Sequence, residues 1–157
     1  MEGVSPALPI MDANSNRVNE DTERAKQQAG AQLASIEDLV ACLEHAESCT
    51  DTACGADCPH DVDAAREAIL GDALDVQVRG EWHTPWAIDG CAPYAYKILL
   101  CWGGPSAQIL GTLDDSNQPD SARLQYQDWF TEWTDYPLTE EEEQTLMKYA
   151  QQFYFDQ

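Results

Sequence analysis

The strongest hydrophobic pattern in this chain lies between residues 94 and 129. Three apolar runs are separated by turn-forming stretches at 103–105 (Gly-Gly-Pro) and 114–120, and these runs cover residues 94–102, 108–113 and 122–129. Short apolar runs divided by Gly, Pro, Asn and Asp are typical of antiparallel strands joined in a meander. The first run is apolar on both faces, which predicts an interior strand with a helix over one side.

Apolar residues at helical spacing precede this meander. The spacing begins at Asn19, a residue type that caps helices, and a near capping box joins Ser35 to Asp38. We therefore expect one helix from Asn19 and a second from Ser35. The second helix would bury a single apolar stripe made of Ile36, Leu39, Val40 and Leu43.

Two more helices and a further strand complete the pattern. Asp61 is a typical N-cap, and Thr139 with Glu142 forms a capping box for the last helix. Residues 74–78 alternate between apolar and polar, which predicts a half-buried strand. The residues expected to face the core are Ala65, Ala68 and Ile69 in the first of these helices and Leu146, Tyr149, Ala150 and Phe153 in the second.

This order of elements predicts an α+β fold. N-terminal helices precede an antiparallel sheet of about four strands, and a C-terminal helix packs on that sheet. Residues 1–18 lack periodicity and predict a flexible N-terminal arm. Residues 19–157 would then form a single domain with a Cys-rich loop at 48–60, and Trp129 is expected in its core.

Charge narrows the functional classes more than any motif does. The 157 residues contain 29 Asp and Glu against 8 Lys and Arg, which gives a net charge of -21. Such a surface repels nucleic acid and anionic membranes and attracts basic partners. We therefore expect no direct nucleic-acid binding, and instead a basic protein or complex as the partner. The alternative is that the acidity only keeps the chain soluble.

The sequence predicts a cytoplasmic protein. Its first residues lack the basic start and apolar stretch of a secretory signal, and no run approaches the ~18 apolar residues of a membrane helix. In that compartment the six cysteines would be reduced thiols or metal ligands.

The Cys-rich loop is the sharpest local motif and a candidate zinc site. It places four zinc-compatible ligands within twelve residues, namely Cys49, Cys54, Cys58 and His60. The spacing differs from the usual paired Cys-x-x-Cys motif, so a loop of reduced thiols is the alternative. A zinc ion here would be a structural staple between helices.

Catalytic motifs are missing from the sequence. It contains no G-x-S-x-G elbow, no H-E-x-x-H zinc motif and no phosphate-binding loop. His83, between Trp82 and Trp86, is a candidate general base, but a packed or exposed histidine explains the same pattern. We therefore expect a protein that is not an enzyme and has no catalytic residues.

The remaining candidates are for binding a partner. Two residues beyond the last apolar run, Trp133 and Tyr136, are typical of aromatic anchors in interfaces. Carboxylates cluster in the turn after residue 113 and at the start of the last helix. The carboxylates predicted to meet a basic groove are Asp114, Asp115, Asp120, Glu140, Glu141 and Glu143.

The segment from Tyr96 to Tyr136, with YQDWFTEW at 126–133 and YAQQFYF at 149–155, resembles a set of small acidic proteins of phages and mobile elements. In size and acidity the chain is also similar to anti-CRISPR and anti-restriction proteins that mimic DNA. This second likeness implies an inhibitor that occupies the basic nucleic-acid-binding groove of a CRISPR surveillance complex or a restriction enzyme. It would act in the host cytoplasm. The alternative is a zinc-stapled adaptor that binds a partner protein through an aromatic face.

Overall fold

The computed structural model describes Gly3 and residues 13–50, 61–82, 84–85, 92–129 and 131–155. Three helices and five strands occur in these ranges. In chain order they are α1 (Ala13–Ser48), α2 (Val62–Asp72), β1 (Asp75–Gly80), β2 (Pro93–Cys101), β3 (Ser106–Thr112), β4 (Arg123–Gln127), β5 (Thr134–Asp135) and α3 (Glu140–Ala150).

The strands form one antiparallel sheet in the order β1-β2-β3-β4-β5. The predicted α+β class and meander are therefore confirmed. β5 is a two-residue edge strand that the hydrophobic pattern did not predict, because Thr134 and Asp135 are both exposed and polar. One continuous row of paired residues fixes the register on the covered face: Val76, Ile98, Ile109 and Leu124.

A single long helix replaces the two that the sequence predicted. α1 has 36 residues, so it is about 54 Å long at 1.5 Å per residue. It begins six residues before Asn19, and Ser35 and Asp38 are exposed in its interior rather than at a helix start. A buried stripe at spacings of three and four residues continues through this point: Ala25, Ala29, Leu33, Ile36, Val40, Leu43 and Ala46. Burial along this continuous stripe stabilises the helix, and this stabilisation outweighs the local capping signal at Ser35.

Both shorter helices begin at the predicted caps. The Asp61 carboxylate accepts hydrogen bonds from the backbone N–H groups of Asp63 and Ala64, at 3.0 and 3.3 Å. In α3 the capping box forms as expected. Thr139 N–H donates to Glu142 Oε2 at 2.6 Å, and Glu142 N–H donates to Thr139 Oγ1 at 3.2 Å.

Most of the predicted core residues of these helices are buried. Ala65, Ile69, Leu146, Tyr149 and Ala150 have less than a tenth of their surface exposed. The prediction for Ala68 is wrong: it is exposed, because it lies at the border of the stripe that buries Ala65 and Ile69. Phe153 is partly buried beyond the end of α3, with its ring centroid 5.4 Å from that of Tyr149.

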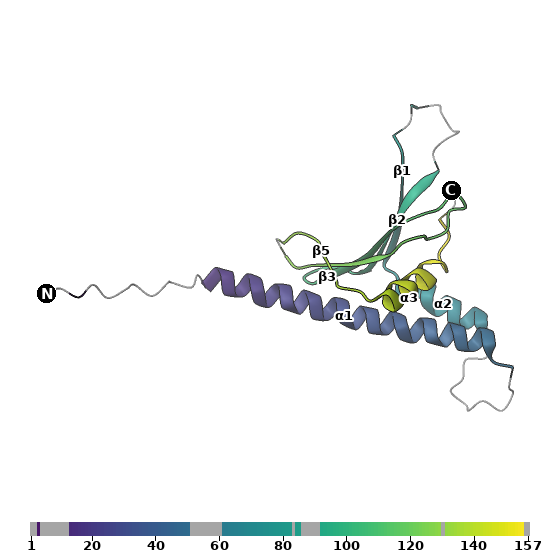
Figure 1. Ribbon diagram of the computed structural model, residues 1–157, viewed down its shortest axis with the longest axis horizontal. Helices are drawn as coiled ribbons and strands as arrows, with labels where there is room; N and C mark the ends of the chain where they lie inside the picture. The colour runs from purple at the N-terminus through teal and green to yellow at the C-terminus, as the bar shows by residue number, and fades with distance from the viewer. Residues whose placement is uncertain are drawn as a thin grey trace.

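The helices form one layer and the sheet forms the other (Figure 1). α1 runs along one face of the sheet, and α2 and α3 pack beside the C-terminal half of α1. The core lies between the layers and is built on Ile36, Ile98, Ile109, Leu124 and Leu146. The opposite face of the sheet carries no helix among the described residues. Along each strand, the residues on this face alternate with residues that face the core.

A tyrosine crosses the end of this sheet where a glycine makes room for it. The Tyr96 ring lies over Gly111, its register partner, and its hydroxyl donates to the backbone oxygen of Ser121 at 2.8 Å. A Cβ at position 111 would lie 2.0 Å from that oxygen and 2.4 Å from Tyr96 Cε1. Phe155 closes the other side of the ring at a centroid distance of 5.0 Å. Tyr96 therefore ties β2 to the loop after β3 and to the end of the chain.

Candidate functional site

The loop between β3 and β4 carries three of the predicted carboxylates, and it is organised by one of them. Asp114 Oδ1 accepts hydrogen bonds from the backbone N–H groups of Ser116 and Gln118, at 2.8 and 3.0 Å. This geometry allows Asn117 to adopt a left-handed backbone conformation, with φ at 57°. Asp120 accepts a hydrogen bond from the Thr112 hydroxyl, and Asp115 is exposed at the tip. Two carboxylates are therefore held in place and the third faces solvent.

Four consecutive glutamates open α3, and they have different roles. Glu142 is used by the capping box, whereas Glu140 and Glu141 are exposed and Glu143 is partly buried. The unpaired N–H groups of the first turn favour negative charge at this position. Glu140 and Glu141 are thus the carboxylates of this helix that a partner can reach most easily.

Tyr96 lies within electrostatic reach of both the β3–β4 loop and the start of α3. Burial raises the pKa of its hydroxyl well above the usual value, and the charges of Asp120 and Glu143 raise it further. Both carboxylates therefore act on one hydroxyl although 23 positions separate them in sequence. We call the six predicted carboxylates of the β3–β4 loop and of the first turn of α3 the acidic end: Asp114, Asp115, Asp120, Glu140, Glu141 and Glu143.

The acidic surface continues from α3 onto α1. A groove of about 230 Å³ between these helices is lined by Glu37, Glu44 and Glu141, with Val40 and Thr145 in its walls. Glu44 is paired with Lys148. Glu37 and Glu141 have no ion pair within the described part of the chain. The sequence did not indicate this groove, because the contact between α1 and α3 joins residues about 100 positions apart.

Charge is divided between the two layers of the fold. The three helices contain fourteen Asp and Glu against five Lys and Arg, a net charge of -9. The five strands contain two Asp against three Lys and Arg, a net charge of +1. The helices are therefore acidic and the strands carry a small excess of basic side chains, while the remaining acidic residues lie in loops and terminal segments.

The predicted aromatic anchors do not share one environment. Tyr136 packs on the core, with its hydroxyl 3.1 Å from the position that a Cβ on Gly30 would occupy, and its N–H donates to Leu124 O at 2.8 Å. Trp133 is partly exposed just before β5. β4 runs away from the loop between β3 and β4, and Trp133 follows β4, so it lies at the other end of that strand. The structure links Asp120 and Glu143 through Tyr96, and Trp133 has no such link to them.

Trp129 is a clear departure from the sequence prediction. It was expected in the core, but 60% of its surface is exposed. β4 ends at Gln127, and the next residue, Asp128, turns inward to bond Arg24 of α1 at 3.2 Å. Trp129 therefore leaves the strand alternation and its indole covers Gly104 in the turn between β2 and β3.

A second tryptophan stands beside the same turn. Trp102 directly precedes it and is 72% exposed. Together with Trp129 it forms what we call the tryptophan pair, two large apolar side chains exposed at one end of the sheet. The sequence signal was available, since Trp102 lies next to Gly103-Gly104-Pro105, where a strand must end.

The zinc prediction falls largely on residues outside the described ranges. Cys54, Cys58 and His60 lie in the segment 51–60, while Cys49 directly follows α1 and is partly buried. No group of three or more His, Cys, Asp or Glu that could hold a metal ion occurs among the residues that the structure describes. Of the candidate catalytic region, His83 and Trp86 also lie outside those ranges, and Trp82 is exposed.

Comparison of this chain with protein-family models, curated proteins and solved structures finds no match. None of the helices in the described ranges is long and apolar enough to span a membrane.

Proposed function

We propose that this chain inhibits a host nucleic-acid-targeting defence system by occupying a basic nucleic-acid-binding groove. One observation carries the proposal: the three helices carry a net charge of -9, and their backbones hold these carboxylates at fixed positions. A basic groove binds DNA through its phosphates, which present one charge per about 1.7 Å of duplex axis. A rigid acidic face offers the same kind of electrostatic complementarity.

The size of the helical layer supports this mode of binding. At about 54 Å, α1 is as long as roughly 16 base pairs of duplex at about 3.4 Å each. Glu37 and Glu141 flank the groove between α1 and α3, so two helices contribute charge to one surface. A partner would meet carboxylates whose backbones are already ordered, which lowers the entropic cost of association.

The acidic end supplies the contacts that we assign to the partner. Asp114 and Asp120 are oriented by hydrogen bonds from Ser116 and Thr112, and Asp115, Glu140 and Glu141 are exposed. Of the two predicted apolar anchors, Trp133 remains a candidate at the other end of β4, whereas Tyr136 packs on the core. Substituting a carboxylate here would mainly slow association, because complementary charge steers the encounter of two proteins.

The partner in this proposal is a CRISPR surveillance complex, with a restriction enzyme as the second choice. The resemblance of the segment 96–136 to small acidic phage proteins supports a phage or mobile-element origin and action in the host cytoplasm. In this mechanism the chain catalyses no reaction, contacts no nucleic acid directly and needs no membrane.

A competition assay tests the proposal. A purified type I surveillance complex binds its target DNA in the presence of increasing amounts of the protein, at several salt concentrations. We expect inhibition that weakens as salt rises, because screening shortens the reach of charge to about 8 Å at physiological ionic strength. Inhibition that is independent of salt, or no inhibition of this complex and of restriction enzymes, would contradict the mechanism.

The tryptophan pair favours a second candidate, an adaptor that binds a partner protein through an aromatic face. Trp102 and Trp129 are exposed at one end of the sheet, and exposed tryptophans are frequent interface anchors. In that candidate a zinc ion held by Cys49, Cys54, Cys58 and His60 would brace the segment after α1. Partner capture that persists at high salt, is lost in Trp102→Ala/Trp129→Ala and falls in Cys54→Ser/Cys58→Ser would support the adaptor over the inhibitor.

A further inference from the structure

The open face of the sheet carries a row of side chains fixed by the strand register. Gln77 of β1 pairs with Lys97 of β2, which pairs with Leu110 of β3, which pairs with Arg123 of β4. The next row begins with Arg79 and continues through Ala95 and Thr112. Each of these residues alternates with a core residue, so their side chains point away from the helices.

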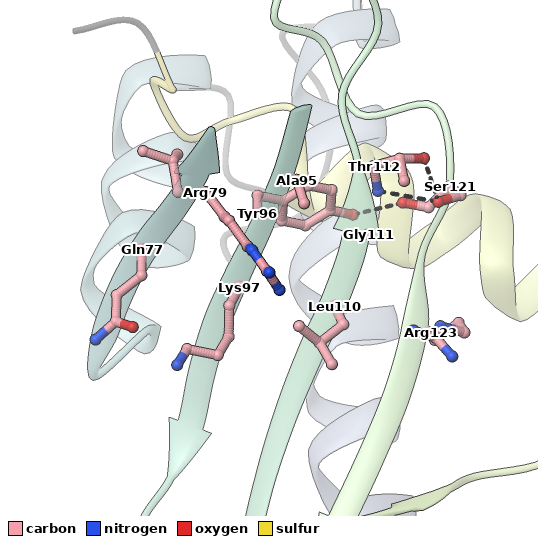
Figure 2. Close-up of a pocket in the computed structure, with 11 residues that line it drawn as sticks. Gln77, Arg79, Ala95, Tyr96, Lys97, Leu110, Gly111, Thr112, Ser121 and Arg123 are labelled. Carbon is pink, nitrogen blue, oxygen red and sulfur yellow. Dashed lines mark hydrogen bonds between the residues drawn. The ribbon is translucent and has the colours of Figure 1, made fainter. Parts of the chain in front are cut away.

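These two rows surround a hollow of about 470 Å³. Figure 2 shows its floor and walls with the helices behind the sheet: Lys97 and Arg79 rise from neighbouring strands, and Arg123 stands on the far side. The Arg79 side chain extends from β1 across β2 toward Leu110. Ala95 and Leu110 form an apolar floor between the three basic residues. A volume of this size is within the range of small-molecule sites.

The charge of this hollow is opposite to that of the rest of the molecule. Three of only eight Lys and Arg in the chain line it. Arg123 lies 3.6 Å from Asp135, a long ion pair on the rim. Arg79 and Lys97 have no carboxylate partner within the described part of the chain. Two cations that face one hollow without a counter-charge repel each other and favour an anion between them.

Three carboxylates on neighbouring positions each accept a hydrogen bond from an uncharged side chain. Asp75 accepts a hydrogen bond from Gln77 at 2.6 Å, and Asp135 accepts one from Gln125 at 2.7 Å. Asp120 is bonded to Thr112. No carboxylate among the described residues lines the hollow. An anion would therefore be placed over the centre, nearest Lys97 and Arg79.

We propose that this hollow binds a nucleotide, independently of the inhibitor function assigned to the helical layer. Arg79, Lys97 and Arg123 would hold the phosphates, since Lys and Arg are the side chains that pair with phosphate in proteins. The base would lie on Ala95 and Leu110 beneath the Arg79 guanidinium, which stacks on flat rings. An inorganic anion would satisfy the cations and leave the apolar floor empty, so the floor favours a ligand with a ring.

Calorimetric titration of the full chain tests this site with four probes in EDTA: AMP, ATP, adenosine and inorganic phosphate. We expect AMP and ATP to bind with a Kd below about 1 mM, ATP more tightly, and adenosine and phosphate each at least about tenfold more weakly than AMP. No nucleotide binding would overturn the proposal. Adenosine binding as tightly as AMP would overturn the role of the cations, and phosphate binding as tightly as AMP would overturn the nucleotide assignment.

Two variants in the hollow and one matched control locate the binding. Lys97→Gln and Arg79→Gln should each weaken AMP binding by about tenfold or more, because each removes a charged hydrogen-bond donor. Lys26→Gln changes the net charge by the same amount on α1, outside the hollow, and should alter the affinity less than about twofold. Equal weakening by Lys26→Gln and Lys97→Gln would mean that net charge alone is responsible, and the site would be wrong. Thermal melting of each variant confirms that these partly or fully exposed substitutions leave the fold intact.

Discussion

Gly111 is a position in the sheet where no room is left for a side chain. Because Gly111 has no side chain, Tyr96 can lie over β3. The Ser121 backbone oxygen can then lie within hydrogen-bond distance of the tyrosine hydroxyl. Gly71, in the last turn of α2, is the opposite case, since a Cβ there would meet nothing within 4 Å. The same substitution, glycine to alanine, can therefore be compared at a crowded position and at an open one.

We expect Gly111→Ala to lower the free energy of unfolding by about 1–3 kcal/mol, the cost of overpacking a tight contact. Gly71→Ala should leave it unchanged or raise it by up to about 1 kcal/mol, because alanine favours a helix over glycine. Urea denaturation of both variants measures the difference. If Gly111→Ala were as stable as wild type, Tyr96 would not pack over this strand as described.

Two buried tyrosines predict how stability depends on pH. The Tyr96 hydroxyl donates to Ser121 O, and the Tyr149 hydroxyl donates to Asp72 Oδ2 at 2.8 Å. Burial raises the pKa of both, and for Tyr149 the neighbouring Asp72 raises it further. The folded state therefore keeps these protons at a pH where the unfolded chain, with tyrosine pKa values near 10, has released them.

We expect the contribution of these tyrosines to the free energy of unfolding to be constant up to about pH 9. Above pH 10 it should fall by at most about 1.4 kcal/mol per pH unit for each tyrosine. Guanidinium unfolding from pH 8 to 11 measures it. Tyr96→Phe/Tyr149→Phe should be less stable at pH 8, by roughly 1 kcal/mol for each lost hydrogen bond, but should decline less steeply above pH 10. Parallel alkaline declines of the variant and wild type would contradict the assignment, since repulsion among carboxylates is common to both.

Single positions were harder to predict from sequence than the pattern around them. Ala65 and Ile69 are buried as expected, but Ala68 is not, since periodicity cannot separate two small residues that border the same helical stripe. Trp129 is exposed because Asp128 turns inward to meet Arg24, and this contact spans 104 positions in sequence. Long-range contacts of this kind leave no local signal.

At the scale of elements, local signals located helix starts well and helix continuity poorly. Asp61 and the Thr139–Glu142 box cap the helices that they were expected to cap. The Ser35–Asp38 signal failed, because a buried stripe on both sides holds α1 together. Capping motifs thus decide where a helix begins only where tertiary packing leaves the choice open.

The α3 capping box gives a direct prediction. Thr139→Ala removes the side chain that accepts from Glu142 N–H, so we expect a loss of about 1 kcal/mol in the free energy of unfolding. Thr139→Ser, which keeps the hydroxyl, should be within about 0.5 kcal/mol of wild type. Chemical denaturation distinguishes them, and equal stability of all three proteins would mean that α3 does not depend on its cap.

At the scale of the whole molecule, the sequence predicted the amount of charge and the structure shows its distribution. Composition gives -21 but does not say that the helices hold -9 while the strands hold +1. The hollow around Lys97 was likewise invisible in sequence. Its three basic residues come from three different strands, and only the register brings them together.

The central claim is that the position of the carboxylates, and not net charge alone, produces inhibition. Two triple variants with the same net charge test it in the DNA competition assay. The first, Asp115→Asn/Glu140→Gln/Glu141→Gln, neutralises exposed residues of the acidic end. The second, Asp75→Asn/Glu132→Gln/Asp135→Asn, neutralises exposed residues toward the other end of the sheet. At low salt we expect the first to lose potency by about tenfold and the second by less than about threefold. Equal loss in both variants, or no loss in the first, would contradict the account.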